Sequence, residues 1–240
     1  MHLSGLDYLV ITLAVVLGAT VQGSIGFGLN LVAVPVVALV EPDALPTMLI
    51  ALALPLTIVM VLREHRHIDR VGLAWTLVGR APGTALGVWI VTVVSAESLA
   101  VIIGATVLLA AVTSVVSPPI PVNRDTALGA GFASGLFGTA TSIGGPPLAL
   151  VYQHHEGAVL RSTLASAFMA GIAFSLAGLA IGGQVAGWQL LAALALVPGL
   201  AVGLWFSAPV ARVVDVRWLR PAVLVFAALT GALAILRGVL

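Results

Sequence analysis

Two glycine-rich stretches, GSIGFGLNLVAVP at residues 23–35 and GLFGTATSIGGPP at residues 135–147, interrupt otherwise continuous apolar sequence. Each lies in a long run that contains no Asp, Glu or Arg. Glycine has the backbone freedom that a break in a helix needs, and proline cannot continue the hydrogen bonding of a preceding helical turn. The two stretches therefore predict two broken helices, over residues 7–40 and 126–153.

Composition places these segments in a membrane. Arginine supplies all 10 basic residues and Asp plus Glu total 9, so charged residues make up 8% of the 240-residue chain, against about a quarter in soluble domains. Hydrophobic residues make up 60%, so most of the surface must face lipid. No basic block suggests nucleic-acid binding, and the lack of Cys excludes disulfides and thiolate metal sites. The amino terminus lacks the basic region of a signal peptide, and we expect it to stay in the mature protein.

The remaining apolar runs predict ordinary membrane helices. About 20 helical residues cross the roughly 30 Å hydrocarbon layer. Barrel strands of alternating polarity do not fit these runs. The predicted fold is an all-α integral membrane protein of about eight membrane segments, forming one membrane domain. The six helices predicted beside the two broken segments lie near residues 44–62, 72–94, 98–116, 160–180, 188–209 and 220–237.

The two halves of the chain match each other, which indicates a duplication. The offset between matched positions grows from 112 residues at the glycine motifs to 116 near the ends of the halves. We predict a first membrane repeat at residues 1–120 and a second at 121–240, each with one broken segment and three helices. The matched pairs are Gly23/Gly135, Gly26/Gly138, Pro35/Pro147, Glu41/Glu156, Leu45/Leu160, Thr47/Ser162, Pro82/Pro198, Gly83/Gly199 and Gly87/Gly203.

Arginine placement predicts how the repeats face, because short cytoplasmic loops attract Arg. Eight simple spans would divide the arginines outside the membrane five to four. If each broken segment enters and returns to the same face, the division becomes eight to one, with residues 41–43, 97 and 182–188 outside. This favours inverted repeats, although two short spans over residues 7–40 would also invert the halves. The eight cytoplasmic arginines are Arg63, Arg66, Arg70, Arg124, Arg161, Arg212, Arg217 and Arg220.

The paired breaks predict a site for a small anion. Irregular backbone at membrane depth needs protein or a water-filled cavity to satisfy its polar groups. The N-terminus of a half-helix offers unpaired N–H groups and a partial positive charge, and Arg80 adds an intramembrane charge. We expect no catalytic residue, metal or cofactor. The predicted substrate-binding residues are Ser24, Gly26, Gly28, Asn30, Arg80, Thr141, Ser142, Gly144 and Gly145.

Each of these features has an alternative structural explanation. Glycines also let helices approach closely, which we expect of the GxxxG pairs Gly83/Gly87, Gly131/Gly135 and Gly199/Gly203. Arg80 could instead bind helix C-terminal carbonyl groups or extend to the membrane surface.

Several motifs resemble the TauE/SafE family: GFGLNLVAVP at residues 26–35, EPDALPT at 41–47, HID at 67–69, GFASGLFGTATSIGGPPLAL at 131–150 and RSTLAS at 161–166. The resemblance covers nearly the whole chain. Members are bacterial membrane permeases described as sulfite and organosulfonate exporters. The resemblance implies a multi-pass secondary transporter of the bacterial inner membrane that exports a small anion such as sulfite, thiosulfate or an organosulfonate.

Two other functions remain as alternatives. An anion channel could use the same site. An intramembrane serine hydrolase could use Ser134 in FASG, but that motif lacks the glycine two residues before the serine, and no His falls within a span to act as base. The expected partners are a small anionic substrate and membrane lipid, with no nucleic acid, and a homo-oligomer is left open.

Overall fold

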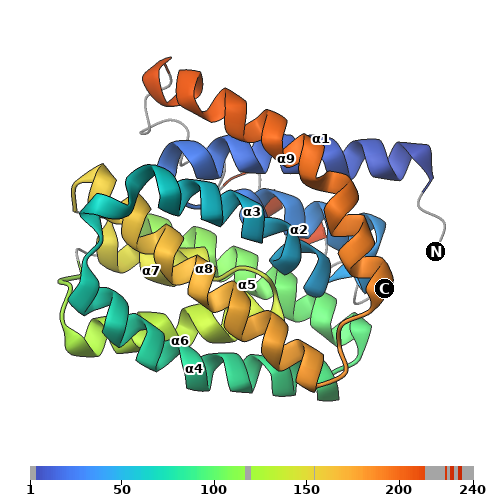
Figure 1. The fold of residues 1–240 in the computed structure, drawn as a ribbon. Coiled ribbons are helices and arrows are strands. Elements are labelled where there is room, and N and C mark those ends of the chain that lie inside the picture. Colours follow the sequence, from blue (N-terminus) through green and yellow to red (C-terminus); the bar gives the residue numbers. More distant parts are fainter. Residues whose placement is uncertain are drawn as a thin grey trace.

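The computed structural model describes residues 4–116, 120–153, 155–213 and five residues between 225 and 233. The described part of the chain is helical, without strands (Figure 1). The predicted helix at 220–237 falls outside it, apart from those five residues. The helices are α1 Gly5–Ile25, α2 Leu29–Val40, η1 Pro42–Ala44, α3 Thr47–Glu64, η2 His65–His67, α4 Arg70–Val93, α5 Ala96–Val116, α6 Arg124–Ala140, α7 Gly145–Tyr152, α8 Gly157–Ile181 and α9 Gly187–Val213.

Four of the described helices, α1, α4, α8 and α9, are long and apolar enough to cross a membrane. Large apolar side chains stand exposed on them, including Ile181 at 90% and Trp205 at 73% exposure. Such side chains are stable in contact with lipid and would be costly in water. The protein is therefore a multi-pass membrane protein.

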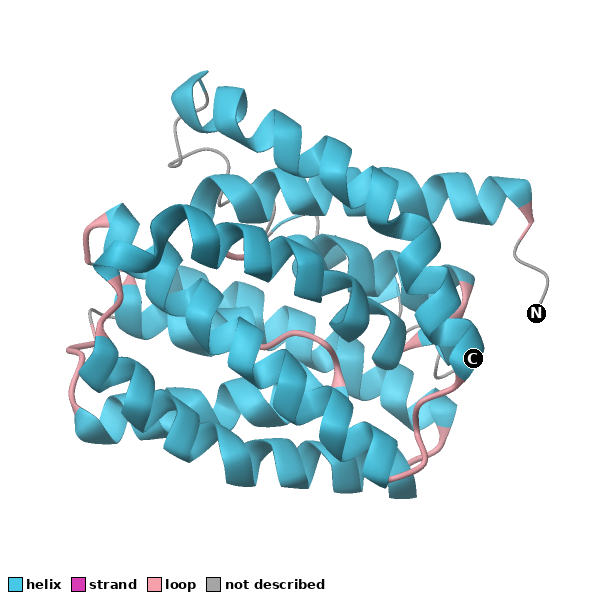
Figure 2. Ribbon diagram, viewed as in Figure 1, coloured by secondary structure: helices cyan, strands magenta, loops and turns pink. Residues whose placement is uncertain are grey.

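Most loop segments gather at two opposite ends of the helical bundle, and one lies between the helices (Figure 2). We call one the arginine end, formed by residues 63–70, 123–126 and 155–161. Its parts are joined by a hydrogen bond from the Asp69 backbone N–H to the Thr163 hydroxyl, at 3.0 Å. The guanidinium of Arg124 also lies over the ring of Trp75, at 4.5 Å.

The other end, which we call the acidic end, is formed by residues 41–46, 94–95 and 182–189. Here the Thr47 hydroxyl donates to the carbonyl oxygen of Gln184 at 3.1 Å. The Gln189 side-chain amide donates to the carbonyl oxygen of Asp43 at 2.9 Å. These bonds join the start of α3 to the turn after α8, and η1 to the start of α9.

The first broken segment is a hairpin whose helices α1 and α2 pack against each other. Helix α1 runs parallel to α9, with Tyr8 bonded to the carbonyl of Ala195 near one end and Ser24 donating to the carbonyl of Ser207, at 3.1 Å, near the other. At the break, Gly26 lies against Arg161 of the arginine end. Helix α2 then returns to the acidic end, where α1 began.

The second broken segment, α6 and α7, enters from the arginine end. Helix α6 runs parallel to α4, and the Asn123 side chain caps its first turn. At the break, the Ser142 hydroxyl faces the acidic end and donates to the carbonyl oxygen of Pro46 at 2.9 Å. Helix α7 returns, and the hydroxyl of Tyr152 donates to the Asp69 carboxylate at 3.0 Å. The first broken segment thus begins and ends at the acidic end, and the second begins and ends at the arginine end.

The spacing of the two breaks differs from the spacing of the matched glycine motifs. The last residues of α1 and α6, Ile25 and Ala140, are 115 positions apart, and the first residues of α2 and α7, Leu29 and Gly145, are 116 apart. The matched glycines Gly26 and Gly138, 112 positions apart, therefore do not occupy the same place relative to the two breaks, since Gly26 caps α1 and Gly138 lies inside α6.

The predicted packing role of the GxxxG pairs is confirmed. A Cβ added at Gly83 or Gly131 would collide with backbone of the facing helix in the α4–α6 pair. A Cβ at Gly203 would collide with the backbone of Val16, where α9 meets α1. These glycines let the backbones come into direct contact, which is how small residues join helices in a membrane.

Candidate functional site

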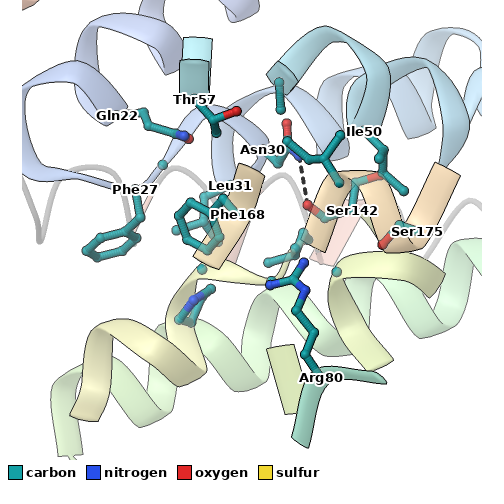
Figure 3. A pocket seen from close by; sticks show the side chains of 18 residues that line it. Gln22, Phe27, Asn30, Leu31, Ile50, Thr57, Arg80, Ser142, Phe168 and Ser175 are labelled. Carbon is teal, nitrogen blue, oxygen red and sulfur yellow. Dashed lines mark hydrogen bonds between the residues drawn. The ribbon is translucent and has the colours of Figure 1, made fainter. Parts of the chain in front are cut away.

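A cavity of about 60 Å³ lies where the two breaks meet α3, α4 and α8 (Figure 3). Such a space is large enough for a small polyatomic ion or a few water molecules. The residues that line it are Gln22, Phe27, Gly28, Asn30, Leu31, Ile50, Ala53, Thr57, Arg80, Gly138, Ser142, Ile143, Gly144, Gly145, Pro146, Phe168, Ile172 and Ser175.

Six of the nine predicted site residues line this cavity: Gly28, Asn30, Arg80, Ser142, Gly144 and Gly145. The other three lie outside the lining. The Ser24 hydroxyl bonds to carbonyl groups of α1 and α9, and the Thr141 hydroxyl donates to the carbonyl of Phe137 at 2.7 Å. Gly26 ends α1 with a φ of +95°.

The N-terminus of α2 faces the cavity with unpaired donors. Gly28 precedes it with a φ of +132°, a conformation that L side chains rarely adopt. The side-chain oxygen of Gln22 accepts from the backbone N–H of Leu29 at 3.0 Å. The hydrogen bonds of the described residues include none from the backbone N–H groups of Asn30 and Leu31. These two donors are available to a ligand, as expected for the first turn of a helix.

The N-terminus of α7 meets α2 at the same cavity. Ser142 holds a φ of +63°, and Gly144 and Gly145 begin the helix ahead of two prolines, which have no N–H to satisfy. A Cβ added at Gly145 would lie 3.2 Å from the Cβ of Phe27, which belongs to the first break. The two breaks therefore touch, and the positive ends of two half-helices share one space.

Arg80 brings a full positive charge into this space. Its side chain is 3% exposed, and Nη1 donates to the Ser134 hydroxyl at 2.8 Å. That hydroxyl in turn donates to the carbonyl oxygen of Gly144 at 2.6 Å, which fixes Arg80 relative to the second break. Nε of Arg80 is buried without a partner, and no carboxylate of the described residues bonds to the guanidinium. A buried charge without a counter-ion is costly, so the site favours an anion.

Two glycines leave the space that the Arg80 side chain occupies. A Cβ added at Gly171 would fall on the guanidinium group, and one at Gly138 would lie 3.2 Å from Nη2. The side chain thus passes between α6 and α8 because both helices lack a side chain at that level. The sequence showed Arg80 as an intramembrane charge, but it gave no sign that Gly171 and Ser134 position it.

The rest of the lining, which the sequence did not indicate, is mostly apolar or already hydrogen-bonded. Phe27, Phe168 and Ile172 supply apolar walls. The Thr57 hydroxyl donates to the carbonyl oxygen of Leu54 at 2.9 Å, and Ser175 bonds to the Thr139 hydroxyl at 2.7 Å. Gln22 could have been found, because it is the one amide side chain in α1 and directly precedes the first glycine motif.

The site offers positive charge and N–H donors rather than metal ligands. Within the described ranges, no three His, Asp or Glu side chains are grouped to hold a metal ion. Ser134 is hydrogen-bonded to Arg80 and Gly144 and has no His partner among the described residues. The arrangement suits reversible anion binding inside the bundle.

A helical multi-pass protein with a buried, positively charged cavity between two broken helices is a membrane transport protein by class. The family model of the sulfite exporter TauE/SafE matches residues 10–234, and the chain belongs to this family. Membership implies membrane transport of the sulfite or anion exporter type. Comparisons with curated proteins and with solved structures gave no significant match.

Proposed function

We propose that this protein is a secondary transporter that exports a small anion, such as sulfite, thiosulfate or an organosulfonate, across the bacterial inner membrane. The observation that carries the proposal is Arg80, which is buried in the cavity where two half-helix N-termini meet and has no carboxylate partner among the described residues. A monoanion about 4 Å from Arg80 would gain on the order of 4 kcal/mol at an effective dielectric near 20, before its desolvation is subtracted.

The two halves are inverted repeats in this proposal, and the arginine end is cytoplasmic. Reciprocal packing supports it: α1 lies along α9 as α6 lies along α4, α3 packs on α9 as α8 packs on α4, and α3 and α8 pack together. The breaks approach opposite ends, one beside Arg161 and the other beside Pro46. Movement of one repeat against the other would open the cavity to each side in turn.

Two matched hydrogen bonds would close the two sides. Thr47 begins α3 and bonds to Gln184 at the acidic end, and Thr163 of α8 bonds to Asp69 at the arginine end. The two threonines are 116 positions apart and the two loop residues 115, the same offsets as at the breaks. Opening to one side would break one bond and leave the other in place.

Counter-flow in proteoliposomes tests the function. Vesicles loaded with unlabelled sulfite should take up labelled sulfite faster than empty vesicles do, and the rate should saturate with sulfite concentration. An anion channel would instead give conductance without acceleration by internal sulfite. Absence of any sulfite, thiosulfate or organosulfonate flux from well-folded protein would contradict the proposal. Empty liposomes and heat-unfolded protein are the controls.

A further inference from the structure

The cavity holds an unpaired acceptor as well as unpaired donors. The side-chain nitrogen of Asn30 donates to the carbonyl oxygen of Ser142 at 2.7 Å (Figure 3). Because that carbonyl can only accept, it fixes the orientation of the amide. The side-chain oxygen Oδ1 of Asn30 is then left buried without a partner. A simple oxyanion cannot satisfy this atom, since a carbonyl oxygen and an anionic oxygen are both acceptors.

None of the unpaired donors bonds to this acceptor. Arg80 enters the cavity from α4, below Asn30 in the view of Figure 3, and its Nε is unpartnered. Two other polar side chains of the lining also leave it unpaired: the Thr57 hydroxyl donates to the carbonyl oxygen of Leu54, and Gln22, whose side-chain oxygen accepts from the backbone N–H of Leu29, makes no bond to it. The described residues therefore supply no donor to Asn30 Oδ1, and the ligand or a water molecule must.

We propose that Asn30 determines specificity, and that the site selects a singly charged oxyanion that also carries a hydrogen-bond donor. This inference rests on the proposed function and refines the substrate class of the same site. The ionised oxygens of the ligand face Arg80 and the N-termini of α2 and α7. An O–H or N–H of the ligand donates to Asn30 Oδ1. An anion of equal size and charge that lacks the donor leaves this acceptor unsatisfied, and its affinity is lower for that reason.

Two probe anions isolate the donor. Sulfamate, H₂N–SO₃⁻, and methanesulfonate, CH₃–SO₃⁻, have nearly the same shape and one negative charge at neutral pH, but only sulfamate has N–H donors. Their dissociation constants are measured by calorimetry on the purified full chain in lipid nanodiscs. We expect the wild type to bind sulfamate about threefold to tenfold more tightly, as one net hydrogen bond provides.

Two variants assign the preference to Asn30. In Asn30→Leu, which keeps the bulk of the side chain, the two anions should bind with equal affinity. In Thr57→Val, a matched change in the same cavity whose hydroxyl is already bonded within α3, the preference for sulfamate should persist.

The outcomes separate this inference from the proposed function. Equal binding of both anions by the wild type would overturn the inference and leave the anion site intact, as would a preference that survives in Asn30→Leu. A water molecule that satisfies Asn30 Oδ1 would produce the former result. Failure of the folded wild type to bind either anion would overturn the anion site itself.

Discussion

Substitution of Gly171 by alanine tests how the fold positions Arg80. The added methyl group would occupy the space of the guanidinium, so the arginine side chain must leave its place beside Ser134 and the cavity. If this doubles the distance between guanidinium and anion, from about 4 to about 8 Å, the Coulomb attraction falls from about 4 to about 2 kcal/mol at an effective dielectric near 20. A loss of about 2 kcal/mol corresponds to roughly thirtyfold weaker binding.

The assay is calorimetric titration of sulfite into Gly171→Ala and into a matched control, Gly178→Ala. Both substitutions lie on α8 and both raise helix propensity by about 1 kcal/mol. The control methyl would meet the side chain of Val88, at 2.8 Å, rather than Arg80. Sulfite affinity in Gly171→Ala within threefold of Gly178→Ala would refute the positioning argument. Partial recovery of affinity in the double variant Gly171→Ala, Arg80→Lys would support it, because lysine lacks the planar fork that collides.

Three further predictions concern packing, orientation and closure. Gly83→Ala should lower the free energy of unfolding by about 1–3 kcal/mol, because its Cβ meets backbone of α6, whereas Gly129→Ala, with nothing within 4 Å, should leave the melting temperature in detergent unchanged or higher. In this Cys-free chain, an impermeant maleimide added to intact cells should label Asp43→Cys and not Arg66→Cys; labelling of both from outside would exclude the proposed orientation. Thr163→Val removes the hydroxyl that accepts a backbone N–H at the arginine end and should increase sulfite exchange from that side, and an unchanged counter-flow rate would show that this bond does not close the path.

The helical fold could be predicted from sequence because its causes are local. Apolar runs between charges gave each long helix to within a few residues, and glycine and proline in the runs predicted both breaks. The close contacts at Gly83, Gly131 and Gly203 follow from small residues four positions apart. The match of Gly26 to Gly138 does not align the two breaks, whose helix ends are 115 and 116 positions apart. Gly and Leu are abundant here, and such residues match readily by chance.

Only part of the candidate site could be predicted from the sequence, because much of it depends on contacts between residues far apart in the chain. The residues at the two helix starts, such as Gly28 and Gly145, carry a local signal. The support of Arg80 by Ser134, 54 positions away, and the space at Gly171 arise only when α4, α6 and α8 pack together. Ser24 is a hydroxyl residue within the first glycine motif and was therefore predicted to bind the substrate, yet its hydroxyl donates to a carbonyl group of α9 and joins α1 to that helix.

In the proposed function, Arg80 holds an anion inside the bundle. The direct test is equilibrium binding of labelled sulfite to nanodisc-embedded wild type, Arg80→Gln and Arg124→Gln. The last variant removes an arginine that stacks on Trp75 at the arginine end, away from the cavity, and serves as the control for net charge. We expect a loss of at least thirtyfold in affinity for Arg80→Gln and a change of less than threefold for Arg124→Gln. Equal sulfite affinity in wild type and folded Arg80→Gln would contradict it.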